Sequence, residues 1–334
     1  MRVILRFAFS VLVALASLAA AAEPPTSVAE ALSRDDVPAL REALAEVART
    51  TSVDAAADAF VRAIEAVPRN RAFRALYESA LAGLTSRSGK GYLFVLVPGW
   101  LYRTDPETGA DLARVRSVLA SLGLGTRLVP LDENGTIEAN ASALVTEVER
   151  LEDGGRQLIL VSTSKGGPET YLALDRLRQT GRANHVTAWV NIGGLLNGTA
   201  VADHWSEWPR SWLAAAGFVL RGHGTASIDS MTTKASRARY AAASLPSHLL
   251  VVNYLGVPTS SDVHGGVRER YELLAKFGPN DGLTLLADAI VPRGITLVEP
   301  RYDHFLAMPD LDRRAAALTL ALLETLEAGA EPQR

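Results

Sequence analysis

The sequence predicts an α/β fold in which a mostly parallel β-sheet is flanked by helices. Three observations support this prediction. From Gly91 onward, short apolar runs alternate with longer stretches of helical periodicity. The runs are almost continuously apolar, as expected of strands that are buried on both faces. The 334 residues, of which 48% are hydrophobic and 21% charged, are enough to bury a sheet of this kind.

The first 22 residues have the organisation of a secretory signal peptide. Arg2 and Arg6 form a short basic region, residues 7–18 are apolar, and residues 20–22 are small. The apolar run is shorter than the ~20 residues that a spanning helix needs, although an uncleaved anchor is the alternative. We therefore expect a periplasmic or secreted protein with no transmembrane span in the mature chain. The absence of cysteine suits an oxidising compartment.

Residues 23–88 are predicted to form an N-terminal helical region. Apolar residues recur there at helical spacing, which indicates three amphipathic helices. Asp35 or Asp36 can cap the helix that has Pro38 in its first turn. No chemistry is evident in this region, so we expect it to pack on or cover the main domain, residues 89–334. The three apolar groups are Val37, Leu40, Leu44 and Val47; Phe60, Ile64 and Val67; and Phe73, Leu76 and Leu81.

The main domain is expected to supply the strands and helices of the sheet in alternation. Sites in such sheets lie at the carboxyl ends of the strands, so the loops after the strands are the expected location of any chemistry. Strands are predicted at residues 92–97, 126–131, 158–161, 186–192, 249–257 and 295–299. Helices are predicted at residues 110–122, 137–151, 168–179, 267–277 and 311–326.

Charge and composition exclude several classes of protein. The formal net charge of −3 and the pI of about 6.1 give no global basic footprint for nucleic acid. The lack of cysteine excludes a disulfide scaffold, a thiolate zinc site and a cysteine nucleophile. The histidines and carboxylates do not recur at metal-ligand spacing, so neither a metal nor another cofactor is expected.

The clearest chemical signal lies in residues 158–168, which read LILVSTSKGGP. A strand ends, a tight turn follows, and a helix begins near Pro168. Ser164 is at the apex of the turn, with the small residues Ser162 and Gly166 two positions before and after it. Such a turn strains its apex and exposes the hydroxyl beside a helix N-terminus. Ser164 is therefore a candidate nucleophile; the alternative is an ordinary turn with surface serines.

Residues 91–326 resemble the α/β-hydrolase superfamily, on its esterase and lipase side. The resemblance is carried by this turn and by the downstream residues described next. The family's turn is Gly-x-Ser-x-Gly, from which Ser162 departs mildly. The resemblance implies an α/β-hydrolase fold and a Ser-His-acid triad that works through an acyl-enzyme.

The resemblance also implies an oxyanion hole made of backbone amides. One donor is the amide of Lys165, which follows the proposed nucleophile. The other is expected from the loop after the first main-domain strand, at Trp100 in preference to Leu101. Many family members have His-Gly where this chain has Pro98-Gly99. The Lys165 side chain itself is expected to be a solvated charge, and Trp100 has pocket lining or core packing as its alternative roles.

The family's chain order places an acid and then a histidine after the serine. His304 follows the last predicted strand and resembles the family's Asp-His-Phe-type loop; His264 is its rival. Asp281 precedes Gly282 in a segment that resembles the lipases' Asp-Gly loop. Asp262 is the alternative acid, because it lies nearer the end of the preceding strand. Asp303 is expected to shape the loop that carries the histidine.

A helical cap insertion is expected at about residues 198–246. Trp205, Trp208 and Trp212 are crowded there and are expected to cover an apolar acyl pocket, with ordinary domain packing as the alternative. The sequence thus predicts an exported serine hydrolase of carboxylic esters, lipid esters included. Amidase or thioesterase activity with the same triad is one alternative. The other is an inactive hydrolase-like domain that binds a lipid or a protein partner.

Overall fold

The computed structural model describes residues 26–83, 89, 91–152, 154–207 and 225–330. The predicted signal peptide, residues 1–22, lies outside the described residues, as do Trp208 and Trp212. Six parallel strands form one sheet in the order β2-β1-β3-β4-β5-β6, which confirms the predicted fold class. The strands are β1 (Tyr92–Val97), β2 (Gly125–Leu128), β3 (Gln157–Thr163), β4 (Val186–Ile192), β5 (Leu250–Val257) and β6 (Ile295–Pro300).

The order of the strands creates a crevice at the carboxyl ends of β1 and β3. The chain passes from β1 to β2 on one side, and then returns to add β3 on the other side of β1. The loops that follow β1 and β3 therefore lead away in different directions. In open parallel sheets, ligands bind in the space between two such loops. Val97 at the end of β1 pairs with Ser162 of β3, so the residues just beyond both strands lie close together.

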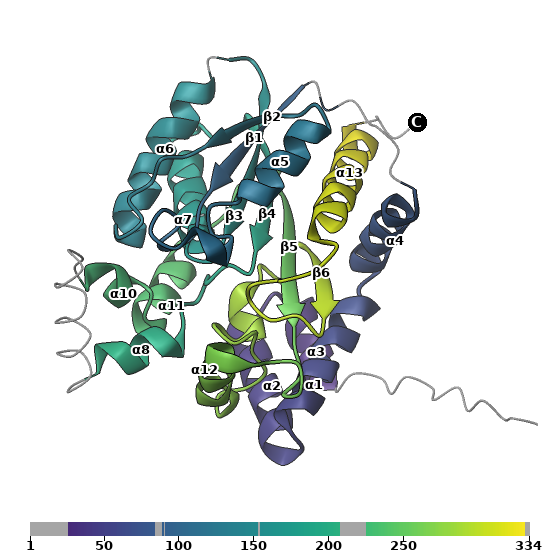
Figure 1. Cartoon of the computed structure of the whole chain (residues 1–334), viewed down its shortest axis with the longest axis vertical. Helices are drawn as coiled ribbons and strands as arrows, with labels where there is room; N and C mark the ends of the chain where they lie inside the picture. The colour runs from purple at the N-terminus through teal and green to yellow at the C-terminus, as the bar shows by residue number, and fades with distance from the viewer. Residues whose placement is uncertain (1–25, 84–88, 90, 153, 208–224, 331–334) are drawn as a thin grey trace, which may run out of the picture.

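Helices cover both faces of the sheet (Figure 1). On one face, α6 (Ile137–Glu152) and α7 (Gly166–Gln179) pack against Val95 and its neighbours. On the other face, α5 (Ala113–Ser121), α13 (Leu311–Ala330) and α4 (Pro68–Ala82) pack against Phe94 and its neighbours. Phe94 and Val95 are adjacent in β1 and both buried, because successive strand residues face opposite sides.

The described part of the N-terminal region, residues 26–83, contains four helices rather than the predicted three. They are α1 (Thr26–Ser33), α2 (Val37–Thr50), α3 (Val53–Ala66) and α4. The eight residues of α1 are too few to show a clear periodicity, so the sequence did not reveal it. Asp36, not Asp35, caps α2 by accepting a hydrogen bond from the Ala39 amide at 2.9 Å.

The first three helices cover part of the sheet directly. Val28, Leu40 and Phe60 belong to the same buried cluster as Leu255 of β5 and Val298 of β6. In Figure 1 these helices lie together beside the carboxyl ends of both strands. The N-terminal region thus shares its hydrophobic core with the main domain, as a covering role requires.

The insertion between β4 and β5 contains α8 (Ala200–Ser206), α10 (Ala226–Ser230) and α11 (Thr233–Ala242) among the described residues. α12 (Gly265–Ala275) follows β5, and two short 3-10 helices, η1 (Pro106–Thr108) and η2 (Leu286–Ala289), lie in loops. Some predicted boundaries were wrong: β2 ends at Leu128, and α7 begins at Gly166, two residues before Pro168. In the described ranges, no helix is both long and apolar enough to cross a membrane.

Candidate active site

Ser164 occupies the strained turn that the sequence predicts. β3 ends at Thr163, and α7 begins at Gly166. The backbone of Ser164 has φ 51°, in the left-handed region that residues with a side chain rarely adopt. Its amide donates to the carbonyl of Ile192 at 3.0 Å, and its carbonyl accepts from the Gly167 amide at 2.9 Å. These bonds to β4 and α7 hold the strained residue in place.

The small residues of the turn allow it to approach the loop after β1. A Cβ atom added at Gly166 would lie 2.7 Å from the carbonyl oxygen of Pro98. A Cβ atom at Gly99 would lie 3.3 Å from the Cβ atom of Ser164. Both contacts are closer than side chains normally permit. The segment that carries Trp100 therefore passes directly beside the serine.

Ser162 stands where the superfamily that the sequence resembles has glycine, and the structure gives a reason. Its hydroxyl is fully buried and accepts a hydrogen bond from the indole Nε1 of Trp189 at 2.8 Å. Trp189 of β4 is itself fully buried. A buried indole N–H requires an acceptor, and glycine would offer no side chain to supply one.

His304 lies between Ser164 and Asp281. The Nε2 atom of His304 is 3.1 Å from the Oγ atom of Ser164, and its Nδ1 atom is 2.8 Å from Oδ2 of Asp281. A carboxylate only accepts hydrogen bonds, so the tautomer that satisfies both contacts has its proton on Nδ1 and accepts from the serine hydroxyl at Nε2. The three predicted residues thus form one hydrogen-bonded series.

Asp281 is fixed from several directions. Its Oδ1 atom accepts from the amides of Leu283 at 2.8 Å and Thr284 at 2.7 Å, and the side chain is fully buried. Its carbonyl oxygen accepts from the amide of His304 at 2.8 Å. Asp303 has the local role expected of it, because its Oδ1 atom accepts from the Phe305 amide at 3.0 Å. These bonds orient the carboxylate and the imidazole toward each other.

The alternative residues do not reach Ser164. Asp262 accepts from the amide and hydroxyl of Thr259 at 2.8 and 2.7 Å, and from Nε of Arg301 at 3.4 Å. Burial alone would raise its pKa, but the hydrogen bonds from Thr259 and Arg301 outweigh burial and lower the pKa of Asp262. His264 is exposed at the start of α12. Asp262 is therefore part of a turn, and His264 is a surface residue.

The prediction that Lys165 carries a solvated charge is wrong. Its side chain is buried, and its Nζ atom lies 2.6 Å from Oε1 of Glu169. The same oxygen accepts from Nδ2 of Asn140 of α6 at 2.7 Å. Burial raises the pKa of the Glu169 carboxyl. The only sequence signal was the spacing of four between Lys165 and Glu169, which is equally typical of an exposed helical pair.

The loop after β1 is held by a residue that the sequence did not reveal. One carboxylate oxygen of Glu133 accepts from the amides of Arg103 at 2.8 Å and Thr104 at 3.0 Å. The Trp100 side chain packs against the buried cluster that contains Ile228 of α10. The loop with the proposed second oxyanion donor is thus fixed by a carboxylate on one side and by the insertion on the other. Leu101 follows with φ 55°.

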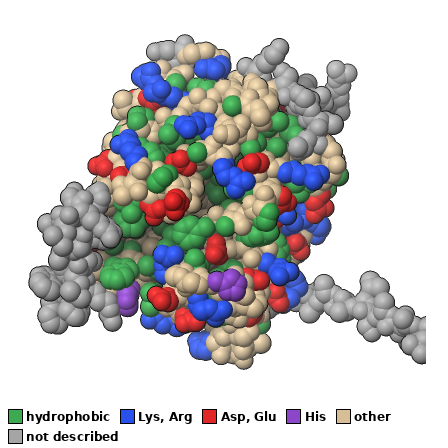
Figure 2. Space-filling model, in the orientation of Figure 1, with side chains coloured by type: hydrophobic (Ala, Val, Ile, Leu, Met, Phe, Trp, Pro, Cys, Tyr) green, Lys and Arg blue, Asp and Glu red, His purple; other side chains and the backbone are tan. Residues whose placement is uncertain are grey.

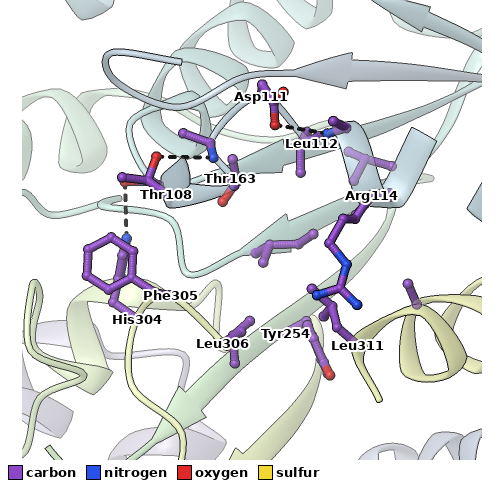
Figure 3. Close-up of a pocket in the computed structure, with 18 of the residues that line it drawn as sticks. Thr108, Asp111, Leu112, Arg114, Thr163, Tyr254, His304, Phe305, Leu306 and Leu311 are labelled. Carbon is purple, nitrogen blue, oxygen red and sulfur yellow. Dashed lines mark hydrogen bonds between the residues drawn. The ribbon is translucent and has the colours of Figure 1, made fainter. Parts of the chain in front are cut away.

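A cavity of about 430 Å³ opens beside Ser164 and His304. Thr108, Asp111 and Leu112 of the β1–α5 loop lie across it from His304 and its neighbours (Figure 3). In Figure 2, hydrophobic side chains gather around a hollow in the middle of the face shown. The inner wall is mainly apolar and includes Phe94, Val161, Val190, Tyr254, Leu318 and Leu322.

The described part of the insertion does not form this cavity. No residue of 198–207 or 225–246 is among its lining, and the walls come mainly from the β1–α5 loop, the sheet and α13 instead. The Trp205 side chain is 47% exposed. The prediction that this insertion covers the acyl pocket is therefore wrong for its described residues.

Within the described ranges, no group of His, Asp and Glu side chains is arranged to hold a metal ion.

Comparisons with solved structures agree with this architecture. The metagenomic carboxyl esterase MGS0156 superposes with a TM-score of 0.62 and 22% identity, over 79% of this chain and 95% of that one. The mature lipase BlEst2 of Bacillus licheniformis superposes with a TM-score of 0.54 and 20% identity, over 72% of this chain and 94% of that one. No protein-family model and no curated protein matches the sequence. The chain therefore has the α/β-hydrolase fold that its sequence indicates.

Proposed function

We propose that this protein is a serine hydrolase that cleaves carboxylic esters through an acyl-enzyme. The observation that carries the proposal is the hydrogen-bonded series Ser164–His304–Asp281, with separations of 3.1 and 2.8 Å, at an apolar cavity. The fold shared with esterases and lipases supports it as an analogy. Export, with cleavage after residue 22, belongs to the same proposal and is supported by the sequence alone.

In the first half-reaction, the Ser164 hydroxyl oxygen bonds to the ester carbonyl carbon while His304 Nε2 takes its proton. The carbonyl electrons move to the oxygen, where the amides of Lys165 and Trp100 are the proposed donors. The bond to the leaving alkoxide then breaks, and His304 returns the proton to it. Asp281 stabilises the imidazolium form throughout. Water repeats the sequence on the acyl-enzyme and releases a carboxylic acid.

The proposed substrate has an apolar acyl chain. The inner wall of the cavity is lined by Val161, Val190 and Leu318, so a hydrocarbon chain that enters it leaves water. Each methylene buried there would contribute about 0.8 kcal/mol until the cavity is filled. A short acyl group such as acetyl would leave much of the cavity unused.

The kcat/KM values of phenyl esters with acyl chains of two to twelve carbons provide the test. We expect a rise of roughly fourfold per methylene over the short esters, followed by a plateau or a fall once the chain exceeds the cavity. A preference for acetate would contradict an apolar acyl site.

Ser164→Ala should abolish turnover while the protein still folds, with a loss of about 10⁴-fold or more.

Amides and thioesters of the best acyl group separate the proposal from its nearest alternatives. A carboxylic ester hydrolase should turn over the ester with the highest kcat/KM of the three. If the amide or the thioester is preferred instead, the mechanism stands but the substrate class is wrong. A protein that binds the ester and hydrolyses none of the three is a binding module, which would contradict the proposal.

A further inference from the structure

Arg270 is a cation of the cavity wall for which the described residues supply no acidic partner. It lies on α12, is half-buried, and lines the cavity that contains Ser164. Its guanidinium carbon is 5.7 Å from the centre of the Phe305 ring, and that ring is 5.6 Å from the imidazole of His304. Among the described residues, none accepts a hydrogen bond from its buried Nε atom, and no carboxylate forms an ion pair with it.

The other charges of the lining are arranged differently. Arg114 forms an ion pair with Asp312, with Nε 2.9 Å from Oδ1. The acidic residues of the lining, Asp105, Glu107 and Asp111, all belong to the loop between β1 and α5. Figure 3 shows Asp111 on the opposite side of the cavity from Phe305. An anion in this cavity would be repelled by that loop and attracted toward Arg270.

The position of Arg270 over the Phe305 ring, which in turn contacts His304, indicates which part of a substrate it would meet. His304 Nε2 must approach the leaving oxygen of the ester to protonate it. In the proposed function, the acyl chain enters the apolar interior lined by Val161 and Val190, away from this oxygen. The alcohol portion is therefore the part of the substrate that lies along Phe305 toward the guanidinium.

We propose that Arg270 selects esters whose alcohol portion carries an anionic group, a carboxylate or a phosphate. The inference rests on the proposed function, since it assigns the leaving-group side of the same site. Guanidinium donors match both anions, and a charge-assisted hydrogen bond in a half-buried position favours binding substantially. Arg270 is in this account a specificity-determining residue and takes no part in the chemical steps.

Three hexanoate esters of para-substituted phenols test this assignment. Their substituents are a neutral carboxamidomethyl, a carboxymethyl and a phosphonomethyl group. In the wild type, kcat/KM should favour at least one anionic ester over the neutral one, and Arg270→Gln should lower that ratio by about tenfold. Arg268→Gln is the matched control on the same helix, because Arg268 is exposed, pairs with Glu272 and does not line the cavity. It should leave the ratio unchanged.

The outcomes separate this inference from the function on which it rests. A response confined to the carboxylate or to the phosphonate would support the proposal and identify the anion. If the neutral ester is turned over but the ratio is the same in the wild type and in Arg270→Gln, the role of Arg270 is overturned. If no ester is hydrolysed and Ser164 is not labelled by an acylating probe, the proposed function itself fails.

Discussion

Lys165 combines one role for its backbone amide with another for its side chain. Its amide is a proposed oxyanion donor, and its ammonium is buried against Glu169 at 2.6 Å. A buried ion pair stabilises little relative to apolar residues of similar size, but removing one partner leaves an uncompensated charge. Glu169→Met should therefore lower the free energy of unfolding by about 3–5 kcal/mol, as measured by urea denaturation.

The double variant Lys165→Met/Glu169→Met provides the matched comparison. It removes both charges and keeps their volume, so its free energy of unfolding should return to within about 1–2 kcal/mol of the wild type. If Glu169→Met and Lys165→Met are each harmless on their own, the two side chains do not form a buried ion pair. If the double variant is as unstable as Glu169→Met, lost packing rather than an unpaired charge explains the effect.

At the scale of an element, Glu133 determines where the loop after β1 lies. Its carboxylate accepts from the amides of Arg103 and Thr104, within a few residues of Trp100. Glu133→Gln should lower kcat by about tenfold with little change in KM, because the proposed oxyanion donor shifts. Asp132→Asn is the control, since Asp132 is exposed and its carboxylate accepts from the Asn134 amide of its own turn. Equal effects of both changes would contradict a specific role.

The same carboxylate predicts a pH dependence of stability. Burial alone would raise its pKa, but the hydrogen bonds from Thr104 and Arg103 outweigh burial, so the pKa of Glu133 is lowered. Its contribution to the free energy of unfolding is fully present above the ordinary pKa of the unfolded carboxyl and is lost as pH falls through the lower folded pKa. Glu133→Gln should show a smaller loss of stability on acidification than the wild type. A parallel decline in both proteins would rule this contribution out.

At the scale of the whole molecule, the N-terminal helices and the sheet share one core, so they should unfold together. Phe60 of α3 is fully buried in the cluster that contains Leu255 and Val298. Phe60→Ala should lower the free energy of unfolding by about 3–5 kcal/mol. All five tryptophans lie beyond residue 89, so tryptophan fluorescence reports on the main domain. Asp58→Asn, an exposed change on the same helix, is the control.

A shift of the fluorescence transition by Phe60→Ala would mean that the helices and the sheet unfold cooperatively. An unchanged fluorescence transition, with a separate loss of helical circular dichroism, would mean that the N-terminal region is an independent unit. That result would contradict the shared core described here.

The sequence predicted the strands well because both faces of the sheet are covered, which makes β1 continuously apolar and β3 and β5 largely so. Ser164, His304 and Asp281 were also accessible to sequence reasoning, because each follows a recognisable strand or resembles a family motif. The burial of Lys165 and the origin of the cavity walls could not be predicted from the sequence. They depend on contacts between segments far apart in the chain, such as α13 against the sheet, which no local pattern encodes.

Covalent labelling of Ser164 is the sharpest test that this serine is the nucleophile. The protein is treated with a fluorophosphonate, and the modified peptide is located by mass spectrometry. The proposed mechanism predicts one phosphonyl adduct, on the peptide that contains Ser164, with no adduct in Ser164→Ala and strongly slowed labelling in His304→Ala. A wild-type protein that stays unlabelled under conditions that label a known serine esterase, or a label that persists in Ser164→Ala, would contradict the account.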